Sequence, residues 1–163
     1  MRFTCSIFAL LAFTLPAFAD PDAEKSVGIG LGVGVATGPN VQLASTNLGQ
    51  LDIGFGYQLD DSFRFQTDYA WRLIDFSASH ALALPLYLGV GGFMSDHREG
   101  FNNTGVRVPL GLQADFARAP IQVFGEVSPE LVVAQFYDHS MPPPPAPPGT
   151  LGVSGLMGVR AAF

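Results

Sequence analysis

Apolar and polar residues alternate with period two along much of the chain, most clearly over Thr104–Phe116. Successive side chains of a β-strand point to opposite faces of the sheet, so an alternating segment predicts one apolar wall and one polar wall. The apolar positions here are Val106, Val108, Leu110, Leu112, Ala114 and Phe116; the positions between them are Arg107, Pro109, Gly111, Gln113 and Asp115. An apolar wall backed by charges of both signs is typical of a transmembrane β-barrel.

Eight segments of this kind follow one another from residue 27 to the end of the chain. Strands joined in sequence order form an antiparallel meander, so the pattern predicts an all-β fold, an eight-stranded up-and-down barrel. The predicted strands are Val27–Ala36, Asn40–Asn47, Gln50–Leu59, Ser62–Leu73, Ala81–Phe93, Thr104–Phe116, Ile121–Gln135 and Leu151–Phe163.

Three longer connections are expected between these strands: Ile74–His80, and the polar loops Met94–Asn103 and Tyr137–Thr150. The last loop contains the run Pro142–Pro148, broken only by an alanine. Such a run favours polyproline II, either as an exposed docking arm or as a plain loop tip. A β-bulge is expected at Gly91–Gly92, where the alternation slips.

Three prolines, Pro85, Pro109 and Pro129, lie within predicted strands. Proline has no backbone N–H, which normally confines it to edge strands or bulges, and a closed barrel has no edge. The pattern itself offers only local bulges or interior water as ways to accommodate them.

The first 19 residues read as a secretory signal. Arg2 provides the positive start, Ile7–Leu15 is an apolar run, and a small-x-small site predicts cleavage between Ala19 and Asp20. The alternative, a membrane anchor, requires a helix that spans ~30 Å of hydrocarbon, and this run is too short. We therefore expect a signal over residues 1–19, a polar leader over 20–26 and a barrel over 27–163.

Composition supports export and argues against nucleic acid as a partner. Charged residues make up 13% of the chain, about half of the ~25% usual for soluble domains. The net charge is −6, and no basic stripe is present to neutralise phosphates. The one cysteine, Cys5, lies in the predicted signal, so the remainder has no disulfide and no thiolate site.

Aromatic residues on the apolar wall fall into two bands. Tyr57, Phe63 and Phe65 lie near one rim of the predicted barrel, and Trp71 and Phe116 lie near the other. Such girdles are what the two headgroup layers of a membrane favour. A periplasmic N-terminus also places both long loops outside. The alternative is a soluble lipocalin-like barrel, whose apolar face points inward and whose charges face bulk water.

The polar walls of the eight strands predict an ionic network inside the barrel. An eight-stranded barrel has room for packed side chains, so these charges must pair with one another. A narrow gated pore lined by Arg64, Arg107 and Glu126 is the alternative. The predicted network consists of Asp52, Arg64, Asp68, Arg72, Arg107, Asp115, Glu126, Glu130 and Arg160.

Several motifs resemble a family of small, uncharacterised bacterial outer-membrane barrels, similar in architecture to the transmembrane domain of outer-membrane protein A. The resemblance implies an eight-stranded barrel in the outer membrane of a diderm bacterium, without catalysis. It implies that Phe163 is part of the signal read by the barrel assembly machinery, with membrane lipids and periplasmic chaperones as further partners. The motifs are Gly28-x-Gly-x-Gly32, Leu84-Pro-Leu-Tyr-Leu-Gly-Val-Gly-Gly92, Gly105-Val-Arg-Val-Pro-Leu-Gly-Leu112, Pro120-x-x-Val-Phe-x-Glu126 and Gly158-Val-Arg-x-x-Phe163.

The histidines are the candidates for chemistry. A metal site in the outer loops would use nitrogen and oxygen ligands from Asp96, His97, Glu99, Asp138 and His139, but no ligand spacing supports it. Catalysis would need a third group beside the pairs Ser79–His80 or His139–Ser140. We therefore expect no catalytic, cofactor or metal site. A lipid-modifying enzyme and a soluble carrier remain the alternative functions.

Overall fold

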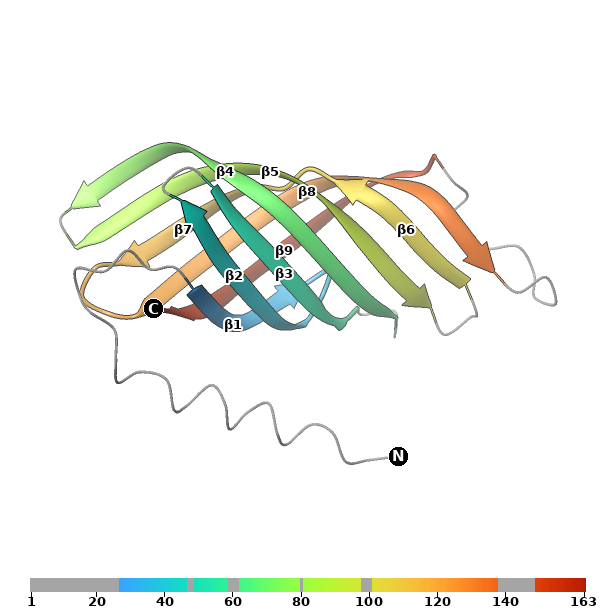
Figure 1. Cartoon of the computed structure of the whole chain (residues 1–163), viewed down its shortest axis with the longest axis horizontal. Helices are drawn as coiled ribbons and strands as arrows, with labels where there is room; N and C mark the ends of the chain where they lie inside the picture. The colour runs from blue at the N-terminus through green and yellow to red at the C-terminus, as the bar shows by residue number, and fades with distance from the viewer. Residues whose placement is uncertain (1–26, 47–48, 59–61, 80, 98–100, 138–148) are drawn as a thin grey trace, which may run out of the picture.

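The computed structural model describes residues 27–46, 49–58, 62–79, 81–97, 101–137 and 149–163, and these form an all-β structure (Figure 1). Every pairing between neighbouring strands is antiparallel. The described residues contain no helix that is long and apolar enough to cross a membrane. The strands are β1 Val27–Gly34, β2 Gly38–Thr46, β3 Gly49–Tyr57, β4 Phe63–Ser79, β5 Leu82–His97, β6 Phe101–Arg107, β7 Leu110–Phe116, β8 Ile121–Tyr137 and β9 Leu151–Ala162.

The nine strands form one sheet whose pairings close into a ring. From β4 the order runs through β3, β2, β1, β9 and β8 to β6 and β7, then through β5 back to β4. Both β6 and β7 lie between β5 and β8, so together they occupy one position in the ring. The prediction of an all-β antiparallel meander is confirmed, with one predicted strand divided into two.

Pro109 marks the division between β6 and β7. Its carbonyl still accepts a hydrogen bond from the Gly89 backbone N–H at 2.8 Å, and Val108 N donates to the Pro129 carbonyl at 3.0 Å. Pro109 and Pro129 thus lie at a single interruption in the wall. The ladder of backbone hydrogen bonds is already broken there. The N–H groups that the two prolines lack therefore interrupt it at one place rather than at two.

Pro85 lies at a second interruption. Between β5 and β7 the paired residues stop at Ala83 opposite Asp115 and resume at Leu86 opposite Leu112. On its other side Pro85 keeps its register partner, Asp75 of β4. Unpaired ladder positions toward β7 accommodate this proline, and a bulge on its β4 side, between Arg72 and Ile74, lies next to it.

Two of the predicted connections are wrong, because the strands continue beyond the segments in which apolar and polar residues alternate. β4 continues to Ser79, where we expected a connection from Ile74; and β5 reaches His97 while β6 begins at Phe101, where we expected a loop over Met94–Asn103. In β4 the register with β5 shifts between Arg72 and Ile74, so Leu73 is a bulged residue. The bulge moves the apolar wall from odd to even positions, which hides the strand from a strict period-two pattern.

The bulge expected at Gly91–Gly92 is absent. The register of β5 with β4 and with β6 passes through both glycines without a shift. The apparent slip in the pattern arises because Phe93 is an apolar residue on the inner wall, where it is buried.

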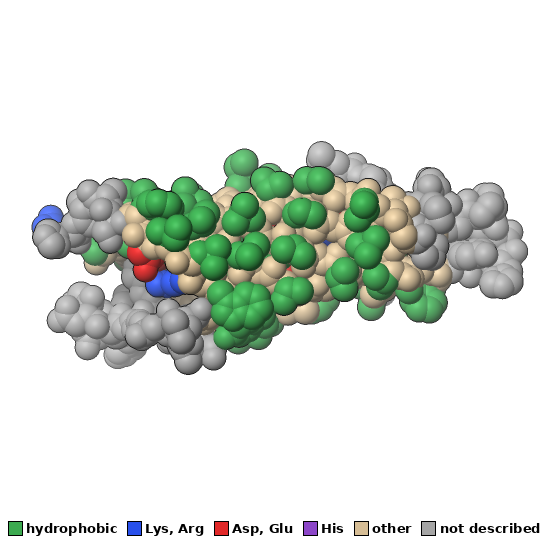
Figure 2. All heavy atoms as spheres, turned by 90° about the horizontal axis from the view of Figure 1, so that it is seen from above, with side chains coloured by type: hydrophobic (Ala, Val, Ile, Leu, Met, Phe, Trp, Pro, Cys, Tyr) green, Lys and Arg blue, Asp and Glu red, His purple; other side chains and the backbone are tan. Residues whose placement is uncertain are grey.

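The two walls have opposite polarity. Arg107 and Gln113 are each 1% exposed, whereas Leu110, which lies between them in the sequence, is 48% exposed. Figure 2 shows hydrophobic side chains spread along the visible side of the molecule, while acidic and basic side chains appear toward one end. Among the residues that the structure describes, the interior of the ring is therefore mainly polar and its outer surface is apolar.

Candidate functional site: the polar interior

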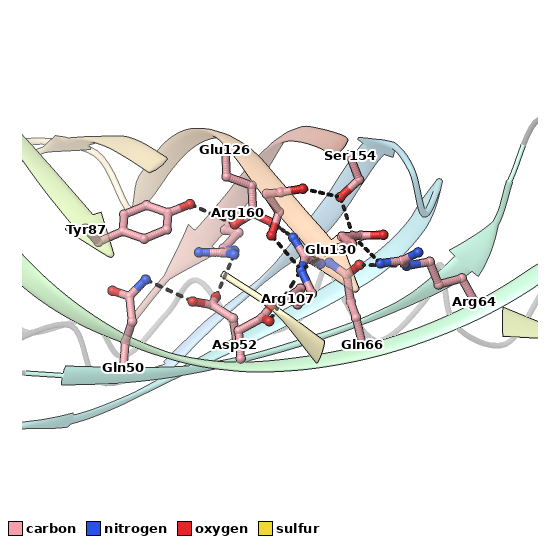
Figure 3. A network of polar contacts seen from close by, with 12 residues as sticks. Gln50, Asp52, Arg64, Gln66, Tyr87, Arg107, Glu126, Glu130, Ser154 and Arg160 are labelled. Atoms are coloured by element: carbon pink, nitrogen blue, oxygen red, sulfur yellow. Dashed lines mark hydrogen bonds and ion pairs between the residues drawn. The ribbon is translucent and has the colours of Figure 1, made fainter. Parts of the chain in front are cut away.

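Arg107 of β6 is the centre of the interior network (Figure 3). Its Nη2 donates to Glu126 Oε1 at 2.6 Å, and its Nε donates to the Ser128 hydroxyl at 3.1 Å. The same Nε lies 3.5 Å from Asp68 Oδ1 and 3.8 Å from Glu130 Oε1. One guanidinium therefore faces three carboxylates, a geometry that a planar, five-donor group supports better than an ammonium.

Arg64 of β4 joins the same network through Glu130. Its Nη2 lies 2.5 Å from Glu130 Oε1, and its Nε donates to Gln66 Oε1 at 3.2 Å. The Ser154 hydroxyl donates to the same Glu130 oxygen. Glu130 thus connects β4, β8 and β9 across the interior.

Arg160 of β9 centres a second group of contacts. Its Nη2 lies 2.7 Å from Asp52 Oδ1, while its Nε and Nη1 donate to Asn40 Oδ1 at 2.5 Å and Gln122 Oε1 at 3.1 Å. Gln50 donates to the other Asp52 oxygen at 2.9 Å. The polar side chains of β1's neighbours β2 and β9 are thereby tied to those of β3 and β8.

The network thins toward the end of the ring at which β4 finishes. Gln122 donates to Asp115 Oδ1 at 2.8 Å, and Gln113 donates to both Asp115 oxygens. Arg72 approaches Asp115 only to 3.9 Å, with 37% of its side chain exposed. This pair therefore lies in water-accessible surroundings, where an ion pair contributes little.

A glycine and an aromatic residue together position Arg64. The Arg64 guanidinium carbon lies 4.1 Å from the ring centroid of Phe93, whose register partner is Gly105. A Cβ on Gly105 would lie 2.5 Å from that ring. The glycine thus leaves the space in which the ring lies flat beneath the cation, and the contact adds a cation–π attraction.

Some interior residues were not singled out by the sequence reasoning. Tyr87 is buried and donates to Glu126 Oε2 at 3.1 Å, and Phe93 and Phe124 lie inward among the arginines. Their phase within the strands was the available signal, since Tyr87 alternates with the outward leucines of β5. Apolar or aromatic identity hid them, because the inner wall was expected to be polar.

The residues of the predicted aromatic bands are exposed on the outer wall. Tyr57 and Phe63 are register partners whose ring centroids lie 5.9 Å apart, with an edge-to-face angle of 77°. Trp71 packs edge-on against Tyr69 at 5.1 Å and lies opposite Gly49, where β3 begins. β4 itself continues eight residues beyond Trp71, so Trp71 lies farther from the end of its strand than the predicted strand Ser62–Leu73 implies. Phe65 and Phe116 are also exposed.

Phe163 pairs with Val27, next to the ladder between β1 and β9. Its N–H donates to the Val27 carbonyl at 2.8 Å, and its carbonyl accepts from Val27 N at 3.2 Å. The last residue therefore continues the β1–β9 ladder beyond the named strands.

The candidates for chemistry are mostly not brought together. His97 stacks on Phe101 at 4.3 Å between ring centroids, and its Nε2 lies 3.3 Å from Asn103 Nδ2. Among the described residues, no group of three or more His, Cys, Asp or Glu side chains is placed to hold a metal ion. Asp96 lies in β5 and Ser79 is the last residue of β4. Outside the described residues lie Ala19 and Asp20 at the predicted cleavage site, His80, Glu99, Asp138, His139, Ser140 and the run Pro142–Pro148.

Comparison with known proteins adds nothing to this geometry, since no family model, no curated protein and no solved structure matches the chain. The resemblance to small outer-membrane barrels remains a prediction that rests on the motifs of the sequence.

Proposed function

We propose that the chain is an exported, eight-stranded β-barrel of a bacterial outer membrane, without catalytic activity, that acts as a structural component or through its outer loops. The observation that carries this proposal is the reversed polarity of its walls. Arg64, Arg107 and Arg160 are buried, whereas large apolar side chains on every strand of the ring are exposed. Water penalises such a surface, and hydrocarbon favours it.

Closure of the ring also supports the proposal. Strands can cross a membrane only if their backbone groups are paired within the protein, which requires a sheet without open edges in the hydrocarbon. The pairings of β4 with β5, and of β6 and β7 with both their neighbours, supply this closure. Counting β6 and β7 as one position gives eight positions, an even number typical of these barrels.

The carrier alternative is less well supported. A soluble carrier of an apolar ligand needs an apolar interior. The described interior is instead filled by guanidinium, carboxylate and amide groups that bond to one another. An apolar ligand would have to displace those contacts and leave buried charges unpaired, at several kcal/mol for each.

The proposed partners follow from the membrane setting and from the family resemblance. They are outer-membrane lipids around the apolar wall, and periplasmic chaperones and the barrel assembly machinery during biogenesis, with Phe163 as part of the assembly signal. We propose no nucleic-acid partner, cofactor or metal. A lipid-modifying enzyme that uses His80, His97 or His139 is the alternative function.

Cell fractionation combined with gel electrophoresis tests the proposal. The protein should remain in the outer-membrane fraction, and its mobility in SDS should change on boiling, because a closed barrel resists SDS until it is heated. Recovery as a soluble periplasmic protein with heat-independent mobility would contradict it. Replacing His80, His97 and His139 together should leave the lipid composition of the outer membrane unchanged. A change in the acylation of its lipids would support the enzyme instead.

A further inference from the structure

The wall of the ring is not equally tall all the way around. β1, β2 and β3 have 8, 9 and 9 residues, whereas β4, β5 and β8 have 17, 16 and 17. Figure 1 shows β4 and β8 running along most of the long axis of the molecule, while β1 covers only part of it. The ring therefore has a short wall, formed by β1, β2 and β3, and a tall wall, formed by the strands from β4 to β8.

The short wall is too low for a bilayer of ordinary thickness. Strands that cross a membrane need about 9–11 residues, and together they cover an apolar band about 25 Å tall. On β1 the outward side chains run from Val27 to Val33, which at a rise of about 3.3 Å per residue and a tilt of about 40° covers about 15 Å. The sequence before Val27 is polar, and Thr37 is exposed in the connection to β2. Hydrocarbon of full thickness would therefore extend beyond the apolar part of this wall.

The wall drops in one step between β9 and β1. β1 pairs with β9 as far as Gly34 opposite Leu156, and Val35 N then donates to the Gly155 carbonyl at 2.9 Å. Toward its start β9 projects beyond this point to Leu151, and it pairs there with β8. In the part of the chain that the structure describes, no strand lies beside this projecting segment on the β1 side. The end of the short wall is thus at the level of Gly155.

The backbone of the projecting segment shows where the lipid surface must lie. Because the Gly155 carbonyl faces β1, the N–H and C=O groups of Val153 and Leu151, which have the same phase, face that side as well. Hydrocarbon would leave these groups without partners, whereas water or lipid headgroups supply them. Beside β1 the hydrocarbon must therefore end no farther out than Gly155.

We propose that the short wall thins the bilayer around it, so that the lipid surface beside the β1–β2 connection is drawn inward to the level of Gly155. This inference rests on the proposed function and adds a specific lipid contact to it: the acyl chains beside β1 and β2 belong to a thinner bilayer than those beside β4 and β5. Tilting the whole ring would not remove the mismatch, because tilt reduces the height that a wall covers. Thinning accommodates a short apolar stretch at modest cost.

Spin labels at single introduced cysteines test the local lipid level. The chain carries Cys5→Ser and is folded into vesicles of dioleoylphosphatidylcholine. Relaxation of each label by oxygen, which partitions into lipid, is compared with relaxation by a nickel chelate, which stays in water. We expect the nickel chelate to dominate at Val153, beyond the short wall, and oxygen to dominate at Leu31, within it.

Met94 of β5 is the matched control. It is an exposed apolar residue near the same end of the ring as Val153, but it is paired on both sides, with Phe65 and with Thr104. Oxygen should dominate at Met94, because the tall wall meets a bilayer of full thickness. The ratio of oxygen to nickel relaxation should be several-fold higher there than at Val153.

Heat-dependent gel mobility shows which labelled variants fold, and Leu151 replaces Val153 if that variant does not. Oxygen dominance at Val153 as strong as at Met94 would overturn the inference, since the bilayer would then have full thickness at the short wall. A label at Val153 that neither reagent reaches would also overturn it, by showing that protein covers the step. Nickel dominance at all three positions would contradict the proposed membrane location itself, so the two failures are distinguishable.

Discussion

The guanidinium carbon of Arg160 lies 3.8 Å from the centroid of the Phe124 ring, on the inner wall of the sheet. The register partner of Phe124 is Gly158, two residues before Arg160 on β9. Glycine, aromatic ring and cation therefore occupy successive layers between the backbone and the interior of the ring. The same arrangement recurs at Gly105, Phe93 and Arg64.

This arrangement predicts that a methyl group at Gly158 destabilises the protein. A Cβ there would lie 2.7 Å from the Phe124 ring and 2.3 Å from the Leu31 carbonyl oxygen. Overpacking of this kind costs about 1–3 kcal/mol, so Gly158→Ala should lower the temperature at which the folded gel band is lost. Gly125→Ala is the control, because a Cβ at Gly125 meets nothing within 4 Å. Equal effects of the two substitutions would contradict the prediction.

The second prediction concerns the pair Arg160 and Asp52. Arg160→Met leaves the Asp52 carboxylate buried without its cation, and breaking such a pair costs about 3–5 kcal/mol. Adding Asp52→Leu should recover much of that loss, since no unpaired charge then remains. Urea unfolding followed by gel mobility or tryptophan fluorescence measures both effects.

The rim pair provides the contrast to this core pair. Arg72→Met removes an ion pair of 3.9 Å in which the arginine is 37% exposed. Exposed pairs contribute about 0–1 kcal/mol, so unfolding should hardly change. A larger loss at Arg72 than at Arg160 would mean that the interior network does not dominate stability.

The third prediction concerns the interruption at Pro109. Since the ladder is already broken there, Pro109→Ala should alter the free energy of unfolding by less than about 1 kcal/mol. Val106→Pro should be much more destabilising, because Val106 is paired on both sides, with Gly92 and with Leu131. Urea titration of both variants makes the comparison, and strong destabilisation by Pro109→Ala would show that the proline is needed for the shape of the wall.

The fold could be predicted from sequence wherever one wall was apolar without a break. Over Thr104–Phe116 the alternation places Val106, Leu110 and Leu112 on the exposed wall and Arg107 and Gln113 on the buried wall, as the structure does. The alternation failed at Leu73 and Ile74, where a bulge lets two consecutive apolar residues share the outer side. Bulges depend on the register with a neighbouring strand, which a single strand's pattern does not contain.

The interior could be predicted in composition but not in connectivity. Phase places Asp52, Arg64 and Arg107 on the polar wall, yet which cation meets which anion depends on the stagger of strands around the ring. The pairing of Arg64 with Glu130, 66 residues along the chain, is of this kind. Phase alone also places Phe93 and Phe124 on the inner wall, but the room for their rings comes from Gly105 and Gly158 in neighbouring strands, which the pattern of one strand does not contain.

The direction in which the two walls face is the claim on which the rest depends, and site-directed spin labelling tests it most directly. Cysteine is introduced at Leu110 or at Gln113, because the single native cysteine lies in the predicted signal, and the label is examined in lipid vesicles. We expect oxygen, which partitions into lipid, to relax the label at Leu110 strongly and the label at Gln113 weakly. Strong oxygen access at Gln113 with protection at Leu110 would contradict the account.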